Sequence, residues 1–110
     1  MTAYIVAMID IQDPQGYEQY GEAWDFRHFT EEYGGEFLII TDQPDDVLEG
    51  AWAGRLVVMK FPDRDKARGW YDSPEYRDVR SIRWAYSTAN MALLPGFDVD
   101  AALAARTPAE

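Results

Sequence analysis

The sequence predicts an α+β fold in which strands and helices follow one another in the order β-α-β-β-α-β. Three observations predict this order. Four short segments rich in apolar and β-branched residues have the length of strands: 3–11, 36–41, 55–61 and 87–95. The segments after the first and third strands instead carry apolar residues at helical spacing and begin with good N-cap residues. Only a loop rich in Asp, Gly and Pro separates the second strand from the third.

The first strand is apolar at nearly every position, which is typical of a strand covered on both faces. Directly after it, Asp13 and Pro14 form a helix start, an N-cap followed by proline at the first helical position. Aromatic residues and a histidine then recur at spacings of three and four: Tyr17, Tyr20, Trp24 and His28. This stripe predicts one continuous helix that ends at Tyr33, where two glycines supply the stop.

The second helical segment is divided by a proline. Asp63 caps a short helix after the third strand, and Ser73 then caps a new helix with Pro74 at its first position. Apolar residues continue at helical spacing as far as Tyr86, and we expect the charges between them to face water. Ser73 therefore marks the restart of a helix and not a linker.

A C-terminal extension, residues 97–110, follows the fourth strand. It reads as an acidic turn, a short alanine-rich helix and a tail that we expect to fray. Residues 1–96 are predicted to form the domain itself. A chain of 110 residues has room for one compact core and not for a second domain.

This order of elements is that of the ferredoxin-like fold, an antiparallel sheet with helices on one face. The strands are apolar on both alternating rows, so the other face of the sheet needs a cover that one chain cannot provide. Sheet-to-sheet packing of two copies would supply that cover. We therefore expect a homodimer of the dimeric α/β-barrel type, with a pocket enclosed or flanked by the barrel.

Charge and composition exclude several function classes. Twenty acidic against ten basic residues give a net charge of -10, which repels phosphate backbones and anionic lipid surfaces. We expect neither nucleic acid nor membrane as a partner. The lack of cysteine excludes thiolate catalysis and Cys-based metal sites, and a single histidine excludes a His-rich one. With no export signal or apolar span in view, we expect a cytoplasmic protein, and no cofactor is predicted.

Three stretches of the sequence, together with Arg83, form a recognisable pattern: YGGEFLI, VLEGAWAGRLVVMKFPD and ARGWYDSPEY. They resemble the family named domain of unknown function 1330, within the dimeric α/β-barrel superfamily. The resemblance covers residues 3–96 and implies the fold and a dimer. Relatives in the superfamily include cofactor-free monooxygenases, lactone isomerases, chlorite and haem-modifying enzymes and plain binding proteins. The sequence departs from the family pattern at Lys60, where an acidic residue is usual, and at residues 40–42, where a basic residue and two glycines are usual.

His28 carries the side chain whose ordinary titration lies nearest neutrality. Its place on the aromatic stripe allows three interpretations. It could be a general base at the mouth of a pocket, an axial ligand to haem, or a hydrogen-bonded structural residue. The stripe itself is more typical of a core or a dimer contact than of a cofactor site.

A second candidate site lies where the long loop meets the third strand. Glu49, Trp52 and Arg55 would bring a carboxylate, an indole and a guanidinium to one edge of the sheet, which suits a small acid or enol. The alternative is a glycine turn with a surface Glu–Arg pair. Lys60 continues an apolar row of the third strand, so its ammonium group lies either at a solvated rim or paired inside the pocket.

The third candidate site is formed by Trp70, Tyr76 and Arg83. Two aromatic rings and one guanidinium could bind an aromatic or carboxylated ligand by stacking and a bidentate contact. As packing residues, the two rings would instead pin the helix pair to the sheet. The acidic residues of the long loop lack the EF-hand spacing, so we expect a solvated loop and no metal site.

These candidates lead to three functional hypotheses. The first is a small-molecule-binding protein or cofactor-independent enzyme of the proton-transfer or oxygenase type, acting on a small aromatic or carbonyl compound. His28 would move the proton, while Arg55 or Arg83 would stabilise an enolate or carboxylate. Trp52 and Tyr76 would shape the pocket. The second is a non-catalytic dimeric accessory or stress-related protein, and the third is a haem-binding protein that uses His28.

Overall fold

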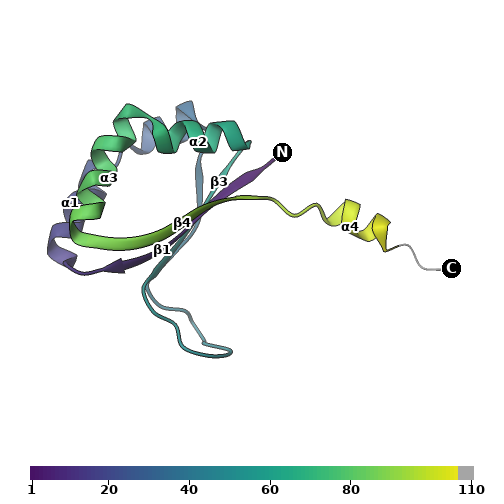
Figure 1. The fold of residues 1–110 in the computed structure, drawn as a ribbon, viewed down its shortest axis with the longest axis horizontal. Helices are drawn as coiled ribbons and strands as arrows, with labels where there is room; N and C mark the ends of the chain where they lie inside the picture. The colour runs from purple at the N-terminus through teal and green to yellow at the C-terminus, as the bar shows by residue number, and fades with distance from the viewer. Residues whose placement is uncertain (107–110) are drawn as a thin grey trace.

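Nine elements follow one another along residues 1–106, the part of the chain that the computed structural model describes (Figure 1). They are β1 (Ala3–Ile11), α1 (Pro14–Ala23), the π-helix η1 (His28–Glu32), β2 (Glu36–Thr41), β3 (Arg55–Phe61), α2 (Arg64–Asp72), α3 (Pro74–Tyr86), β4 (Ser87–Pro95) and α4 (Val99–Ala105). The four strands have the bounds predicted from the sequence. The fraying expected of the C-terminal tail concerns residues 107–110, which lie outside the described residues.

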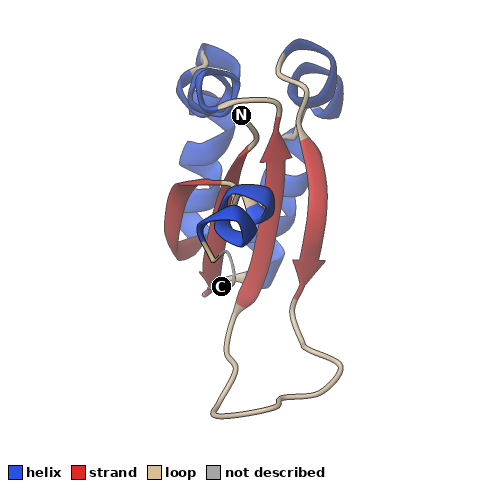
Figure 2. Cartoon of the chain, turned by 90° about the vertical axis from the view of Figure 1, so that its right-hand side faces the viewer, coloured by secondary structure: helices blue, strands red, loops and turns tan. Residues whose placement is uncertain are grey.

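The four strands form one antiparallel sheet in the order β2-β3-β1-β4. β1 is central, and its Ala7 lies opposite Val57 of β3 and Met91 of β4. Helices α1, α2 and α3 cover one face of the sheet (Figures 1 and 2). The predicted α+β, ferredoxin-like arrangement is confirmed.

Aromatic side chains dominate the core between the helices and the sheet. The largest fully buried side chains are Trp70 on α2, Phe29 on η1 and Phe61 on β3. Their ring centroids lie 5.3 to 5.8 Å apart, at the tilted and edge-to-face angles that aromatic pairs prefer. The inward row of β1 completes this core: Ala3, Ile5, Ala7 and Ile9.

The prediction of one continuous helix from Pro14 to Tyr33 is wrong, because α1 ends at Ala23 and the helix is interrupted at Trp24. There the backbone is extended, with ψ of 129°, and Trp24 turns its indole against the core rings of Phe29 and Trp70. Asp25 then starts a second segment, since its carboxylate accepts a hydrogen bond from the His28 N–H at 3.0 Å. The gain from burying the indole and the new cap outweighs helix continuity.

The predicted helix starts at Asp63 and Ser73 are confirmed. The Asp63 carboxylate accepts a hydrogen bond from the Lys66 N–H at 2.8 Å, and Ser73 Oγ accepts one from the Tyr76 N–H at 3.2 Å. Pro74 occupies the first position of α3, where no N–H is needed. The Ser73–Pro74 pair thus sets the direction in which α3 leaves α2 and brings Tyr76 over the core.

The second face of the sheet has no cover among residues 1–106. Three of its apolar side chains, Met8, Ile39 and Leu94, are each more than 40% exposed. The long loop 42–54 and helix α4 project beyond the body of the domain (Figure 1). The radius of gyration is 16.7 Å, whereas a compact domain of about 100 residues has one of about 13 Å. The described chain therefore leaves one apolar face of its sheet exposed, and two of its segments extend away from the body of the domain.

Candidate ligand-binding cavity

A cavity of about 140 Å³ lies between the sheet and helices α1 and α3. Two cations, Arg55 and Arg83, contribute to an otherwise apolar and aromatic lining. The larger side chains of that lining are Tyr17, Tyr20, Trp24, Phe37, Tyr76 and Met91. Planar apolar walls with a few polar groups are the usual composition of a small-molecule site.

Helix α1 supplies two tyrosines from neighbouring positions on one face. Tyr17 and Tyr20 are three residues apart, and their ring centroids are 5.3 Å apart. Gly16 allows this face to come close to α3, because a Cβ atom at that position would overlap the ring of Tyr86. The Tyr20 and Tyr76 hydroxyl oxygens lie 2.6 Å apart, in a hydrogen bond between α1 and α3. Burial and the neighbouring Tyr76 raise the pKa of Tyr20 well above its ordinary value of 10.0.

Arg83 is the unusual group of the cavity. It stands in the last turn of α3, its residue is only 2% exposed, and its Nε has no hydrogen-bond partner. None of the ion pairs formed within residues 1–106 involves it. Burial lowers the pKa of Arg83, whereas Tyr76 and Tyr20 in their ionised forms raise it more, so the guanidinium keeps its charge. Arg83 is thus a buried cation whose neighbours are tyrosines, and among the ion pairs of residues 1–106 it has no carboxylate partner.

Arg55 stands at the rim of the same cavity. Its Nε donates to Asp42 Oδ1 at 2.6 Å, and its guanidinium carbon is 5.4 Å from the centroid of the Tyr17 ring. The hydrogen bond from Arg55 lowers the pKa of Asp42, and the same bond raises the pKa of Arg55. The carboxylate that pairs with Arg55 is therefore Asp42, at the start of the long loop, and not Glu49.

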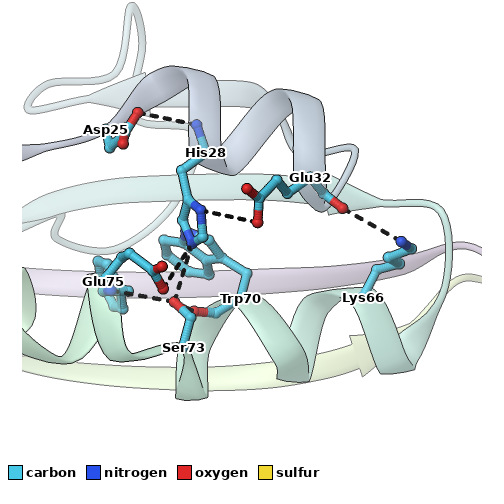
Figure 3. Close-up of polar contacts among 8 residues, drawn as sticks. Asp25, His28, Glu32, Lys66, Trp70, Ser73 and Glu75 are labelled. Atoms are coloured by element: carbon cyan, nitrogen blue, oxygen red, sulfur yellow. Dashed lines mark hydrogen bonds and ion pairs between the residues drawn. The ribbon is translucent and has the colours of Figure 1, made fainter.

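His28 lies outside the cavity, in a cluster between η1 and the start of α3 (Figure 3). Its Nδ1 is 3.3 Å from Glu32 Oε2, and its Nε2 is 3.5 Å from Glu75 Oε1 and 3.4 Å from Ser73 Oγ. The imidazole is buried, and the void beside it measures only about 10 Å³. Both ring nitrogens face protein oxygens, which is the geometry of a structural histidine.

The Ser73–His28–Glu32 sequence of contacts has the connectivity of a catalytic triad. Ser73 Oγ, however, donates its proton to the Trp70 carbonyl at 2.7 Å and accepts the Tyr76 N–H as the cap of α3. The residue is also buried, without a space in which a substrate carbonyl could stand. The hydroxyl is therefore committed to helix capping, and the arrangement does not support nucleophilic catalysis.

The remaining residues predicted for a site are dispersed. Glu49 and Trp52 lie exposed on the projecting loop 42–54, away from the cavity. Lys60 lies on the uncovered face of the sheet, opposite Tyr4 and Glu36. Trp70 is fully buried behind Tyr76, whose ring centroid is 4.1 Å away, so it supports the cavity wall from behind. Of the eight predicted residues, the cavity thus brings together Arg55, Tyr76 and Arg83.

The sequence interpretation missed Tyr17 and Tyr20 as site residues, although it singled out the stripe that contains them. Both were expected to be core or dimer contacts. The signal was the residue type, because a tyrosine hydroxyl on a buried stripe needs a hydrogen-bond partner where phenylalanine would not. Residues 1–106 also contain no group of three acidic, histidine or cysteine side chains arranged to hold a metal ion. No helix in the same part of the chain is long and apolar enough to cross a membrane.

Several solved structures share this fold. The RPA0582 protein of unknown function from Rhodopseudomonas palustris is 16% identical, over 88% of this chain and 83% of its own, with a TM-score of 0.66. A dimeric ferredoxin-like protein of unknown function from Jannaschia sp. CCS1 is 13% identical, over 87% of this chain and 100% of its own, with a TM-score of 0.68. Identities this low show similarity of fold alone.

One similar structure is that of an enzyme. SnoaB, a cofactor-independent oxygenase from Streptomyces nogalater, is 16% identical, over 89% of this chain and 95% of its own, with a TM-score of 0.61. None of the curated proteins matches this sequence. The family model described as Domain of unknown function (DUF1330) matches residues 2–97, nearly the whole domain. By that match, the chain belongs to the DUF1330 family.

Proposed function

We propose that this protein is a small-molecule-binding protein of the cofactor-independent enzyme type. Its substrate is a single-ring phenolate, enolate or aromatic carboxylate, held in the cavity between α1, α3 and the sheet. Arg83 binds the negatively charged oxygen, and Tyr20 and Tyr76 hydrogen-bond beside it. The observation that carries the proposal is that Arg83 is 2% exposed and has no carboxylate partner within residues 1–106.

A buried cation without a counter-ion is unfavourable in the free protein, because the desolvation of the charge is not repaid by a nearby anion. The C-terminal end of α3 reduces this cost, since the free carbonyls of a helix end favour a cation. The Nε of Arg83 is nevertheless left without an acceptor. An anionic ligand in the cavity, which Arg83 lines, would supply the missing counter-ion, so the same desolvated charge becomes a source of binding energy and selectivity.

The size of the cavity limits the ligand. An engineered protein cavity of about 150 Å³ holds one benzene molecule, and the cavity here measures about 140 Å³. The rings of Tyr17, Trp24 and Tyr76 provide apolar faces for a planar ligand. One ring with a charged substituent therefore matches the space and the lining.

Enolate or phenolate chemistry is favoured by the charges around the cavity. A positive guanidinium beside neutral hydroxyl donors stabilises an oxyanion more than the neutral compound from which it forms, and thus lowers the free energy of proton removal. The high pKa of Tyr20 keeps its hydroxyl protonated at neutral pH. The fold shared with SnoaB, which is described as a cofactor-independent oxygenase, supports the same reaction class.

The interpretations that depended on His28 receive less support. A haem cannot enter a void of about 10 Å³, and a general base in this position would not reach the cavity that contains Arg83. In this proposal His28 holds η1 to the start of α3. The accessory-protein hypothesis would be favoured by a filled interior, and the cavity is open.

We also infer that the protein works in the cytoplasm as a homodimer. The uncovered apolar face of the sheet supports the dimer, as do two similar structures that are described as dimeric, from Jannaschia sp. CCS1 and Bacteroides fragilis. Packing of two such faces against each other would remove the exposed Met8, Ile39 and Leu94 side chains from water.

Binding measurements with ligands that are similar in size and differ in charge test the proposal. Benzoate, salicylate and resorcinol at pH 9 to 10 provide anions, and benzamide and benzyl alcohol provide neutral compounds of the same size. We expect the anions alone to stabilise the protein, by about 2.7 kcal/mol at a hundred times the dissociation constant. Arg83→Met should abolish this effect and Arg77→Met, an exposed residue of the same helix, should not. Equal binding of neutral and anionic ligands would refute the role of Arg83. Equal binding of the anions by Arg83→Met and Arg77→Met would refute it too.

A further inference from the structure

A second surface feature lies along β4, one of the two edge strands of the sheet. Three hollows follow this strand from Ser87 to Pro95, on the side where α2 and α3 leave its inward residues partly uncovered. We name this surface the β4 groove and define it by β4 together with Arg64, Arg68, Tyr71 and Trp84. Met91 and Leu93 form its half-buried floor.

Basic side chains gather at the β4 groove of an otherwise strongly acidic protein. Arg64, Arg68 and Arg83 line it, and Arg80 stacks on the rings of Tyr71 and Trp84 at 4.5 and 5.1 Å. These are four of the ten basic residues in a chain of net charge -10. Arg68 already pairs with Asp72 at 2.8 Å, so Arg64 and Arg80 supply the charge that has no carboxylate partner among the ion pairs of residues 1–106. The groove thus combines apolar side chains, an edge strand and a cluster of basic side chains.

The C-terminal arm, which we define as residues 97–105, has the complementary character. Phe97 and Leu103 are 79% and 64% exposed, and no residue of α4 is buried. Asp98 and Asp100 add negative charge beside these apolar side chains, and Arg106 at the C-cap of α4 offsets part of it. The arm continues in the direction of β4 and points away from the domain, so it leaves the groove of its own chain behind (Figure 1).

We propose that the arm of one copy docks in the β4 groove of a second copy, and that the exchange is reciprocal. Phe97, Val99 and Leu103 would cover the apolar floor, while Asp98 and Asp100 would lie near Arg64 and Arg68. A two-fold axis makes both arms equivalent and closes the assembly at two subunits. The inference rests on the homodimer proposed above and adds to it the segment that joins the subunits. Covering the groove also protects the open edge of β4.

Cysteine cross-linking tests this arrangement, because the natural chain contains no cysteine. A tagged Leu103→Cys protein is mixed with an untagged Arg68→Cys protein, allowed to exchange subunits, and oxidised mildly. We expect a disulfide-linked heterodimer. The matched control replaces Arg68→Cys by Glu18→Cys, an exposed position on α1 away from the groove, and should give little product. A chain with both Leu103→Cys and Arg68→Cys shows, at low concentration, whether the arm reaches its own groove.

Sedimentation analysis separates the possible outcomes. Replacing Phe97 and Leu103 together by Ser should raise the dimer dissociation constant about tenfold or more. High salt should raise the dissociation constant of the wild-type dimer as well, because it screens the charge pairs. A dimer that gives no cross-link above the Glu18→Cys control would overturn the arm exchange and leave the sheet-to-sheet dimer intact. An internal disulfide in the doubly substituted monomer would overturn it too. A chain that stays monomeric at all concentrations would reject both the exchange and the homodimer.

Discussion

Tyr20 and Tyr76 share a hydrogen bond of 2.6 Å that joins α1 to α3 across the wall of the cavity. Two hydroxyl groups carry two protons, and their mutual bond uses one of them. One O–H therefore remains free to donate to a ligand, beside the buried guanidinium of Arg83. This relationship defines one polar end of the cavity, whereas Arg55 stands at its rim, and it suits the single negative oxygen of the proposed ligand.

Arg83→Met should stabilise the free protein while it removes anion binding. A methionine fills much of the volume of arginine without a desolvated charge, and replacing buried ionic groups by apolar ones often gains about 1–4 kcal/mol. Urea denaturation measures the free energy of unfolding. Arg77→Met, on the exposed side of the same helix, should change it by less than about 0.5 kcal/mol. A large loss of stability in Arg83→Met would indicate that the guanidinium has a structural partner after all.

The raised pKa of Tyr20 predicts a loss of stability at high pH. Its folded-state pKa lies above the unfolded value near 10, so the folded protein holds a proton that the unfolded chain releases as the pH passes 10. The stabilising contribution is therefore complete below pH 10 and declines above it. Denaturation curves between pH 8 and 11 measure this slope, and Tyr20→Phe should reduce it. An unchanged slope in that variant would assign the effect to other groups.

His28→Ala should destabilise the protein without weakening ligand binding. The buried imidazole contacts Glu32, Glu75 and Ser73, and its removal should cost about 1–3 kcal/mol. The dissociation constant for an anionic ligand should stay within about twofold, because the cluster lies outside the cavity. Calorimetry at a temperature where the variant is folded measures it. Loss of binding or turnover in a folded His28→Ala protein would restore the general-base hypothesis.

The Arg55–Asp42 pair predicts a small effect confined to acid pH. The pKa of Asp42 is lowered in the folded state, so the pair stabilises the protein above the ordinary carboxyl pKa and loses this effect as the pH falls through the lowered value. Asp42 is largely exposed, and the contribution at neutral pH should be below about 1 kcal/mol. Asp42→Asn should show this difference from wild type at pH 7 and none near pH 2. A difference that persists at pH 2 would point to a contact other than the ion pair.

Gly34→Ala and Gly21→Ala are expected to change the free energy of unfolding in opposite directions. Gly34 has a φ of +66°, and a Cβ atom there would lie 2.7 Å from Pro62 Cγ, so alanine should destabilise the protein by about 1 kcal/mol or more. Gly21 is helical, and a Cβ there meets no atom within 4 Å. Alanine at that position should stabilise by about 0.4–1 kcal/mol. Thermal denaturation distinguishes the two, and equal effects would contradict the backbone argument.

Local chemistry in the sequence was sufficient to predict the elements of the fold. Strand propensity gave the bounds of all four strands, and the short-range caps at Asp63 and Ser73 operate as expected because they depend on residues three positions apart. The break at Trp24 could not be predicted in the same way. The helical stripe continues through it, and the gain comes from partly burying the indole against Phe29 of η1 and against Trp70 of α2, which is distant in the sequence.

The sequence by itself determined the α+β order, the acidic charge and the residue types available for a site. Only the tertiary structure decided which of them meet. Arg83 and Tyr76 share the cavity with tyrosines of α1, whereas His28, Lys60, Glu49 and Trp52 are carried elsewhere by a helix break, by strand parity and by a projecting loop. The physical reason is that burial and partner choice depend on distances across the packed core, and a buried cation without a counter-ion is recognisable only when all its neighbours are in place.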